Sequence, residues 1–216
     1  PVQFDLDGGQ RHIIVVGDSQ TGKTSTLRAL ISEALIGKKA NEVMFGMFDM
    51  RRNLLGFVPP DFLGDYAGTA SAAKTLVEGI RLELERRLPP SDVTVEQLRN
   101  RSWWSGPEIY IVVDDFDMIE GNNNPLKPLV PFLAQAADIG LHVIIARRAA
   151  GIGRSSYEPV LQGLKDAGAN GILLSGDRQE GQVWPGVYLQ RLPAGRANWV
   201  DKSGKKHLVQ LAFYPE

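Results

Sequence analysis

Residues 13–30 read IIVVGDSQTGKTSTLRAL, and this stretch decides the fold of the chain. Its first four residues are β-branched and predict a buried strand, whereas apolar residues at helical spacing over 25–36 predict a helix. Between the two, residues 17–24 match G-x-x-x-x-G-K-[ST] at every fixed position. A phosphate-binding loop needs this placement between a strand end and a helix start. The stretch therefore predicts a P-loop nucleotide site.

The residue types within this loop match the chemistry of binding ATP and Mg²⁺. Gly17 and Gly22 let the backbone approach the phosphates closely, and the helix start adds unsatisfied amides and a positive dipole end. Lys23 is expected to reach the β- and γ-phosphates, and the Thr24 hydroxyl is expected to ligate Mg²⁺. The full set of predicted contact residues is Gly17, Asp18, Ser19, Gln20, Thr21, Gly22, Lys23, Thr24 and Ser25.

The composition is that of an ordinary globular α/β chain. Of the 216 residues, 43% are hydrophobic and 23% are charged, with a formal net charge of −1 and no cysteine. The absence of cysteine excludes disulfides and thiolate metal sites, and the net charge gives no global indication of a polyanion partner. We expect residues 1–216 to form a single ATPase domain. Because the chain starts at Pro1, we interpret it as a domain excised from a longer chain.

Apolar runs and helical periodicity alternate along the rest of the chain. Further strands are predicted at residues 42–49, 109–113, 141–146 and 171–174. Helices are predicted at 71–88, 93–100, 126–139 and 157–165, and a loop at 50–66. Such alternation is typical of a mostly parallel sheet flanked by helices.

Shorter strand patterns occupy both ends of the chain. A strand at residues 2–6 and a turn at 7–9 are predicted before the first buried run. Three more strands are predicted at 187–190, 198–200 and 207–213, the last two joined by a turn at 201–206. We expect this C-terminal part to add antiparallel edge strands to the sheet.

The run Ile109-Tyr110-Ile111-Val112-Val113-Asp114 has the Walker B pattern, a buried strand ending in a carboxylate. Carboxyl ends of parallel strands meet at one edge, so Asp114 is expected to orient Mg²⁺ beside Thr24. Asp115 follows where many P-loop ATPases have a glutamate that polarises the attacking water. Its shorter side chain leaves three alternatives: a working base, a slow base, or a residue that only tightens Mg²⁺ binding.

Two arginines, Arg147 and Arg148, end the run at 141–146. Either could sense the γ-phosphate, and Arg148 is our candidate, with Lys23 and Asp115, for the catalytic set. The alternative is that they pair with acidic side chains on neighbouring loops. His142, within the apolar strand, is interpreted as a packed histidine rather than a catalyst.

Taken together, these residues resemble the FtsK/SpoIIIE branch of RecA-like motor ATPases. Within it the chain is most similar to a C-terminal (third) ATPase domain of the EccC/EssC proteins of type VII secretion. The likeness rests on 17–25, the Asp114-Asp115 pair, the run from Pro128 to Arg148, and 192–197. It implies a RecA-like fold within a membrane-anchored chain on the cytoplasmic side of the bacterial inner membrane. Arg147 departs from DNA-pumping relatives, which usually have glutamine there.

The resemblance also implies partners and alternative activities. The implied partners are WXG100-type substrates, recognised through their C-terminal tails, and the other ATPase domains of the same chain in a hexamer. One hypothesis is an export motor, and a second is a nucleotide-locked binding module without turnover whose apolar loops at 57–63 or 103–104 capture the tail. A DNA translocase is disfavoured by the lack of a basic stripe, and a small-molecule kinase by the lack of an evident lid.

Overall fold

The structure is a computed structural model and describes residues 10–212. The predicted strand at 2–6, the turn at 7–9 and the end of the predicted strand at 207–213 lie outside the described residues. Within them, eight strands form one sheet in the order β10-β9-β6-β1-β5-β4-β2-β3. The six neighbours from β6 to β3 pair in parallel, and β9 and β10 add an antiparallel edge. The predicted α/β fold class is therefore confirmed.

The strand that precedes the P-loop lies inside the sheet. β1 (His12–Gly17) is buried at every position and pairs with β5 (Leu141–Arg148) on one side and β6 (Asn170–Leu173) on the other. β5 in turn pairs with β4 (Glu108–Asp114), which pairs with β2 (Val43–Asp49). The carboxyl ends of these strands therefore share one edge, where the P-loop lies.

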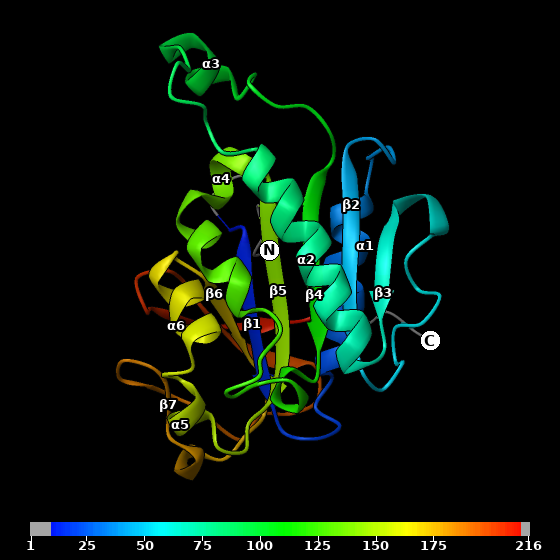
Figure 1. The fold of residues 1–216 in the computed structure, drawn as a ribbon. Coiled ribbons are helices and arrows are strands. Elements are labelled where there is room, and N and C mark those ends of the chain that lie inside the picture. Colours follow the sequence, from blue (N-terminus) through cyan, green and yellow to red (C-terminus); the bar gives the residue numbers. More distant parts are fainter. Residues whose placement is uncertain (1–9, 213–216) are drawn as a thin grey trace.

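Helices cover the two faces of the sheet, as Figure 1 shows. On one face lies α1 (Lys23–Leu35), and on the other lie α2 (Ala70–Arg86) and α6 (Pro159–Asp166). Side chains of β1 alternate between the two cores: Ile13 and Val15 pack on the α1 side, Ile14 and Val16 on the α2 side. The short helix α3 (Val95–Asn100) projects from the end of the molecule opposite the P-loop (Figure 1).

The loop predicted at 50–66 is wrong in its last part. A 3₁₀ turn, η1 (Pro60–Phe62), is followed by β3 (Leu63–Ala67), which pairs in parallel with β2 at the sheet edge. Sequence patterns miss this strand because Gly64 and Asp65 interrupt it with exposed, weak strand formers.

The helix predicted at 126–139 is also different. Residues Lys127–Gln135 form a 3₁₀ helix, η3, and only Ala136–Ile139 form an α-helix, α4. Pro128 and Pro131 provide no backbone N–H, and Pro131 lies inside the element, so the regular α-helical ladder cannot form.

In the C-terminal part, two of the three predicted strands join the main sheet. They are β9 (Arg196–Val200) and β10 (Lys206–Gln210), joined by the predicted turn. The third, β8 (Val187–Tyr188), instead pairs with the unpredicted β7 (Gln182–Trp184) in a separate hairpin. The short α5 (Ile152–Ser155) and the 3₁₀ turns η2 (Phe116–Met118) and η4 (Arg178–Glu180) were not predicted either.

Candidate nucleotide site

The P-loop is shaped by contacts beneath it as well as by its glycines. The Asp18 amide donates to the Ser175 carbonyl at 2.9 Å, which ties the loop to the segment after β6. A Cβ on Gly17 would lie 2.5 Å from Thr21 Oγ1 and 2.7 Å from Leu174 Cβ, so no larger residue fits. Gly22 has φ +101°, where other residues are strained, and α1 begins at the next residue. The loop conformation therefore needs both glycines.

Lys23 is folded back over this loop. Its ammonium donates to the Asp18 carbonyl at 2.8 Å, and Thr21 Oγ1 donates to the same oxygen at 2.9 Å. Burial lowers the pKa of Lys23, and the nearby carboxylates of Asp115 and Asp114 only partly oppose this. The ammonium of Lys23 is therefore partly shielded from water, so an anion that enters the site can stabilise its charge.

The P-loop and the end of β4 are joined by a direct hydrogen bond. Thr24 Oγ1 donates to Asp114 Oδ2 at 2.9 Å, and Asn53 Nδ2 donates to the same oxygen at 3.3 Å. Asp114 is 2% exposed. A hydroxyl and a carboxylate oxygen therefore lie together at the predicted metal position, as a hard cation such as Mg²⁺ prefers.

Asp115 lies beside this pair with an unusual backbone conformation. Its φ is +52°, a left-handed conformation that turns the chain sharply out of β4. Its Oδ2 forms an ion pair with Arg51, with 2.8 Å between this oxygen and Arg51 Nε. Burial raises the pKa of Asp115, and the adjacent Asp114 carboxylate raises it further. The proposed base is therefore already held by a cation of its own chain.

The two arginines at the end of β5 have different surroundings. Arg148 faces the site and is held by Asp117, which accepts from its Nε at 2.6 Å and from its amide at 3.1 Å. Arg147 is 1% exposed on the opposite face, where it contacts Glu120 at 3.4 Å and the Ala150 carbonyl at 3.2 Å. Of these two arginines, only Arg148 lines the site where a nucleotide would bind. It also pairs with an acidic side chain, which was the alternative to phosphate sensing.

A cavity of about 550 Å³ opens between these elements. Its lining includes the predicted Ser19, Gln20, Gly22, Lys23, Thr24, Ser25, Asp115 and Arg148. Gly17, Asp18, Thr21 and Asp114 lie behind the lining, where they fix the loop and the Thr24 hydroxyl. Sequence reasoning missed two lining residues, Arg51 and Asn53, which both come from the loop after β2.

The segment that contains the 192–197 element also touches the P-loop. Arg191 donates to Asp18 Oδ2 at 2.7 Å and to Asp177 Oδ2 at 3.2 Å. The backbone amide of Leu192 donates to Ser175 Oγ. Ser175 therefore contacts both this segment and the P-loop, whose Asp18 amide donates to its carbonyl. Arg191 was not predicted, because nothing in its sequence context indicates that it lies beside residue 18.

The residues around this cavity fit a Mg²⁺–nucleotide. The volume suits a phosphate chain with its sugar, and Lys23, Thr24 and Asp114 provide an ammonium, a hydroxyl and a carboxylate on one wall. Within residues 10–212, no group of three or more His, Asp or Glu side chains could hold a metal by itself. Mg²⁺ usually takes one or two protein oxygens and completes its shell with phosphates and water.

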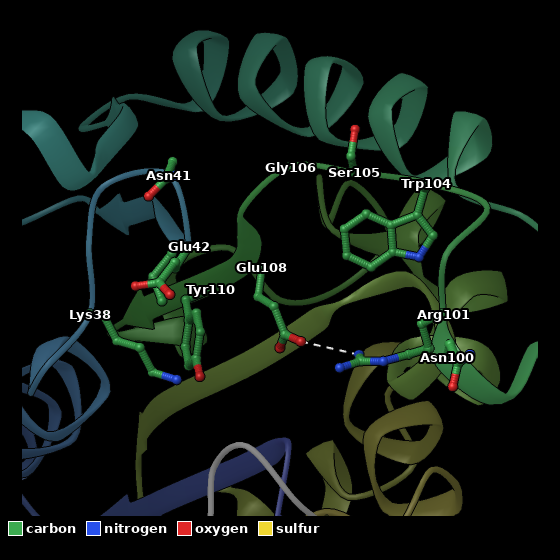
Figure 2. A pocket seen from close by; sticks show the side chains of 11 residues that line it. Lys38, Asn41, Glu42, Asn100, Arg101, Trp104, Ser105, Gly106, Glu108 and Tyr110 are labelled. Atoms are coloured by element: carbon green, nitrogen blue, oxygen red, sulfur yellow. Dashed lines mark hydrogen bonds and ion pairs between the residues drawn. The ribbon is translucent and has the colours of Figure 1, made fainter. Parts of the chain in front are cut away.

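A second hollow, of about 430 Å³, lies at the other end of β2 and β4 (Figure 2). Trp104 and Tyr110 lie along its walls, and Glu108 points across it toward Arg101 (Figure 2). Glu108 also bonds to Arg11 and to the buried His142, which stacks on Tyr110 at 4.0 Å. His142 is thus a packed, hydrogen-bonded histidine, as interpreted from the sequence.

The comparisons agree with the geometry of the nucleotide site. The family model described as "FtsK/SpoIIIE family" matches residues 1–76, which contain the P-loop. The ESX secretion system protein EccC of Thermomonospora curvata is 39% identical over 99% of this chain and 16% of its own length. The ESX-4 secretion system protein EccC4 of Mycobacterium tuberculosis is 38% identical over the whole chain and 17% of its own length. The chain belongs to the FtsK/SpoIIIE family.

This FtsK/SpoIIIE chain also matches solved EccC structures closely. ATPases 2 and 3 of Thermomonospora curvata EccC, in complex with a signal sequence peptide, give a TM-score of 0.94 at 38% identity. That match covers all of this chain and 39% of the other. The chain thus spans about a sixth of the length of the two EccC relatives. Its membership of the family implies nucleotide binding.

In the two apolar loops singled out from the sequence, the aromatic and aliphatic side chains other than the prolines are buried or partly buried. Val58 is buried, and Phe57, Phe62 and Leu63 pack against the core on the α1 side. Trp103 and Trp104 donate from their indole nitrogens to the carbonyls of Arg87 and Asp138. Among residues 10–212, no helix is long and apolar enough to cross a membrane.

Proposed function

We propose that this chain is an ATP-binding domain of a type VII secretion ATPase, one of several ATPase domains in a longer protein. The observation that carries the proposal is the hydrogen bond from Thr24 to Asp114, which joins the two nucleotide motifs in a chain related to EccC. In this proposal the P-loop amides and Lys23 bind the phosphates, and Thr24 and Asp114 hold Mg²⁺. When bound, Mg²⁺ supplies positive charge at the β- and γ-phosphate oxygens.

In the proposed reaction, Asp115 orients water and accepts its proton, and Arg148 stabilises charge at the terminal phosphate. Two features support slow turnover. The Asp115 side chain is one methylene shorter than glutamate, and its carboxylate is paired with Arg51 at 2.8 Å. The raised pKa of Asp115 makes it a better proton acceptor once that pair opens. The same features support the second candidate, a nucleotide-locked binding module without turnover.

We further propose that the domain helps to recognise WXG100-type substrates through their C-terminal tails. The signal sequence peptide named in the EccC structure supports this, since that chain matches over all of the present one. The proposed context is the third, C-terminal ATPase position of a hexameric, membrane-anchored protein at the cytoplasmic face of the bacterial inner membrane. A DNA-translocating role is less well supported, because the basic cluster of Lys202, Lys205 and Lys206 is small and confined to the turn after β9 and the first residue of β10.

The experiment that tests the nucleotide function is to identify and quantify nucleotide retained by the purified domain, followed by titration with Mg-ATP. Retained ATP is expected for the locked module, and ADP or an empty site with measurable phosphate release is expected for turnover. Lys23→Ala is the control. Equal ATP affinity of wild type and Lys23→Ala would reject the proposed site, whereas tail peptides titrated separately test substrate recognition alone.

A further inference from the structure

One wall of the nucleotide cavity comes from a loop outside the two nucleotide motifs. In the sheet register Asp49, the last residue of β2, pairs with Asp114, so the loop after β2 emerges beside the end of β4. This loop contributes Arg51 and Asn53 to the cavity. The pairing of β2 with β4 therefore brings two side chains to a site that their own sequence context does not indicate.

The loop is held rigidly at its base. Asp49 is fully buried, and its Oδ2 accepts from the Leu54 amide and the Tyr66 hydroxyl, both at 2.7 Å. The Asn53 carbonyl accepts from Arg28 of α1 at 2.9 Å. Both ends of the short loop are thus anchored, and its cationic side chain extends from a fixed backbone.

The contact made by Arg51 is weaker than that made by its counterpart Arg148. Arg51 and Asp115 form an ion pair, with 2.8 Å between Nε and Oδ2, and the Arg51 side chain is 51% exposed. Arg148 is bound by Asp117 through both its backbone amide and its guanidinium. The arginine of this pair is half exposed to solvent, which weakens the attraction, so Arg51 can leave Asp115 at small cost when an anion of higher charge enters. The terminal phosphate of a nucleoside triphosphate is such an anion, because it carries more negative charge than one carboxylate and also accepts parallel hydrogen bonds from a guanidinium.

We propose that Arg51 is a phosphate-sensing residue that exchanges Asp115 for the terminal phosphate of a nucleoside triphosphate. The exchange frees the Asp115 carboxylate to orient water only when a third phosphate is present. A nucleoside diphosphate leaves the pair of Arg51 and Asp115 intact. This inference rests on the proposed nucleotide function, and it adds a discrimination between triphosphate and diphosphate that the two motifs alone do not provide.

The test compares affinities for a non-hydrolysable Mg-ATP analogue and for Mg-ADP, measured by calorimetry, in wild type, Arg51→Ala and Arg52→Ala. Arg52 is the matched control, since it removes the same charge one residue away and does not line the cavity. Arg51→Ala is expected to weaken analogue binding about tenfold and to change ADP binding less than twofold. Arg52→Ala is expected to change neither.

Asp115→Asn distinguishes exchange from simple phosphate contact. It should strengthen analogue binding when Arg51 is present, because Arg51 then loses its carboxylate partner and is free to bind the phosphate. In the Arg51→Ala background there is no arginine to release, so the gain should be smaller. Equal strengthening in both backgrounds, or equal loss of analogue and ADP affinity in Arg51→Ala, would overturn the inference. Retained ADP affinity shows that each variant is folded. If the wild type binds neither nucleotide, the proposed function itself is rejected. If the wild type binds both and Arg51→Ala binds them equally well, only the role of Arg51 is rejected.

Discussion

Thr24 on the first turn of α1 and Asp114 at the end of β4 are 90 residues apart in sequence and 2.9 Å apart in space. The hydroxyl donates to the carboxylate, so the proposed Mg²⁺ position is formed by the fold itself. Thr24→Ala is therefore expected to remove most of the Mg²⁺ dependence of ATP affinity, a loss of about tenfold. Thr24→Ser, which keeps the hydroxyl, should retain it. Titrations with Mg²⁺ and with a chelator measure the difference, and identical Mg²⁺ dependence in all three proteins contradicts the role.

Lys23 should separate stability from binding. Burial lowers its pKa, which means that the charged ammonium disfavours folding. Lys23→Met keeps the length of the side chain without the charge, so the nucleotide-free melting temperature is expected to rise by a few degrees. ATP and ADP affinities should both fall at least about tenfold. Thermal unfolding with and without nucleotide checks both results. A lower nucleotide-free melting temperature in the variant would contradict the inference that the charged ammonium destabilises the folded state.

Asp115 should respond to the length of its side chain. Asp115→Glu brings the carboxylate one methylene closer to an attacking water and is expected to raise phosphate release severalfold if reach is limiting. Asp115→Asn should abolish release while nucleotide affinity is kept or increased. Single-turnover phosphate release at saturating ATP is the measurement. Faster release by the asparagine variant would exclude Asp115 as the base.

His12 is expected to make the free energy of unfolding decrease at acidic pH. Burial, together with the nearby His142, lowers the pKa of His12 from 6.5 to about 4. Between these values the unfolded chain binds a proton that the folded chain does not, so stability falls as pH decreases through this range. The loss amounts to roughly 3 kcal/mol at most. Urea unfolding of wild type and His12→Asn from pH 7 to 4 should show a flatter profile for the variant, and His207→Asn, at an exposed position, is the control.

Trp104 is expected to act in stability rather than in peptide capture. Its ring lies 4.4 Å from the Arg87 guanidinium, and its indole donates to the Asp138 carbonyl at 2.7 Å. Trp104→Ala should cost about 2 kcal/mol of unfolding free energy. The affinity for a substrate tail, measured where the variant is folded, should stay unchanged. A selective loss of tail affinity with normal stability would instead assign this side chain to a binding surface.

How much the sequence could predict depends on whether a feature is local. The P-loop and Asp114 were predictable, because fixed spacing defines the loop and parallel strand ends meet at one edge. Arg51 was not, since its contact with Asp115 depends on the register between β2 and β4. The two arginines of β5 were a partial case. Strand alternation places Arg147 and Arg148 on opposite faces, but only the helix arrangement decides which face carries the site.

The position of β1 in the sheet has a consequence for how the chain folds during synthesis. Its two neighbours, β5 and β6, begin at residues 141 and 170, so β1 has no partner strand in the sheet until these later residues have left the ribosome. Such distant pairing slows folding and leaves an apolar strand unpaired for longer. A nascent chain stalled before residue 141 should therefore expose β1 to chaperones, and the ability to bind nucleotide should arise only after β5 has emerged.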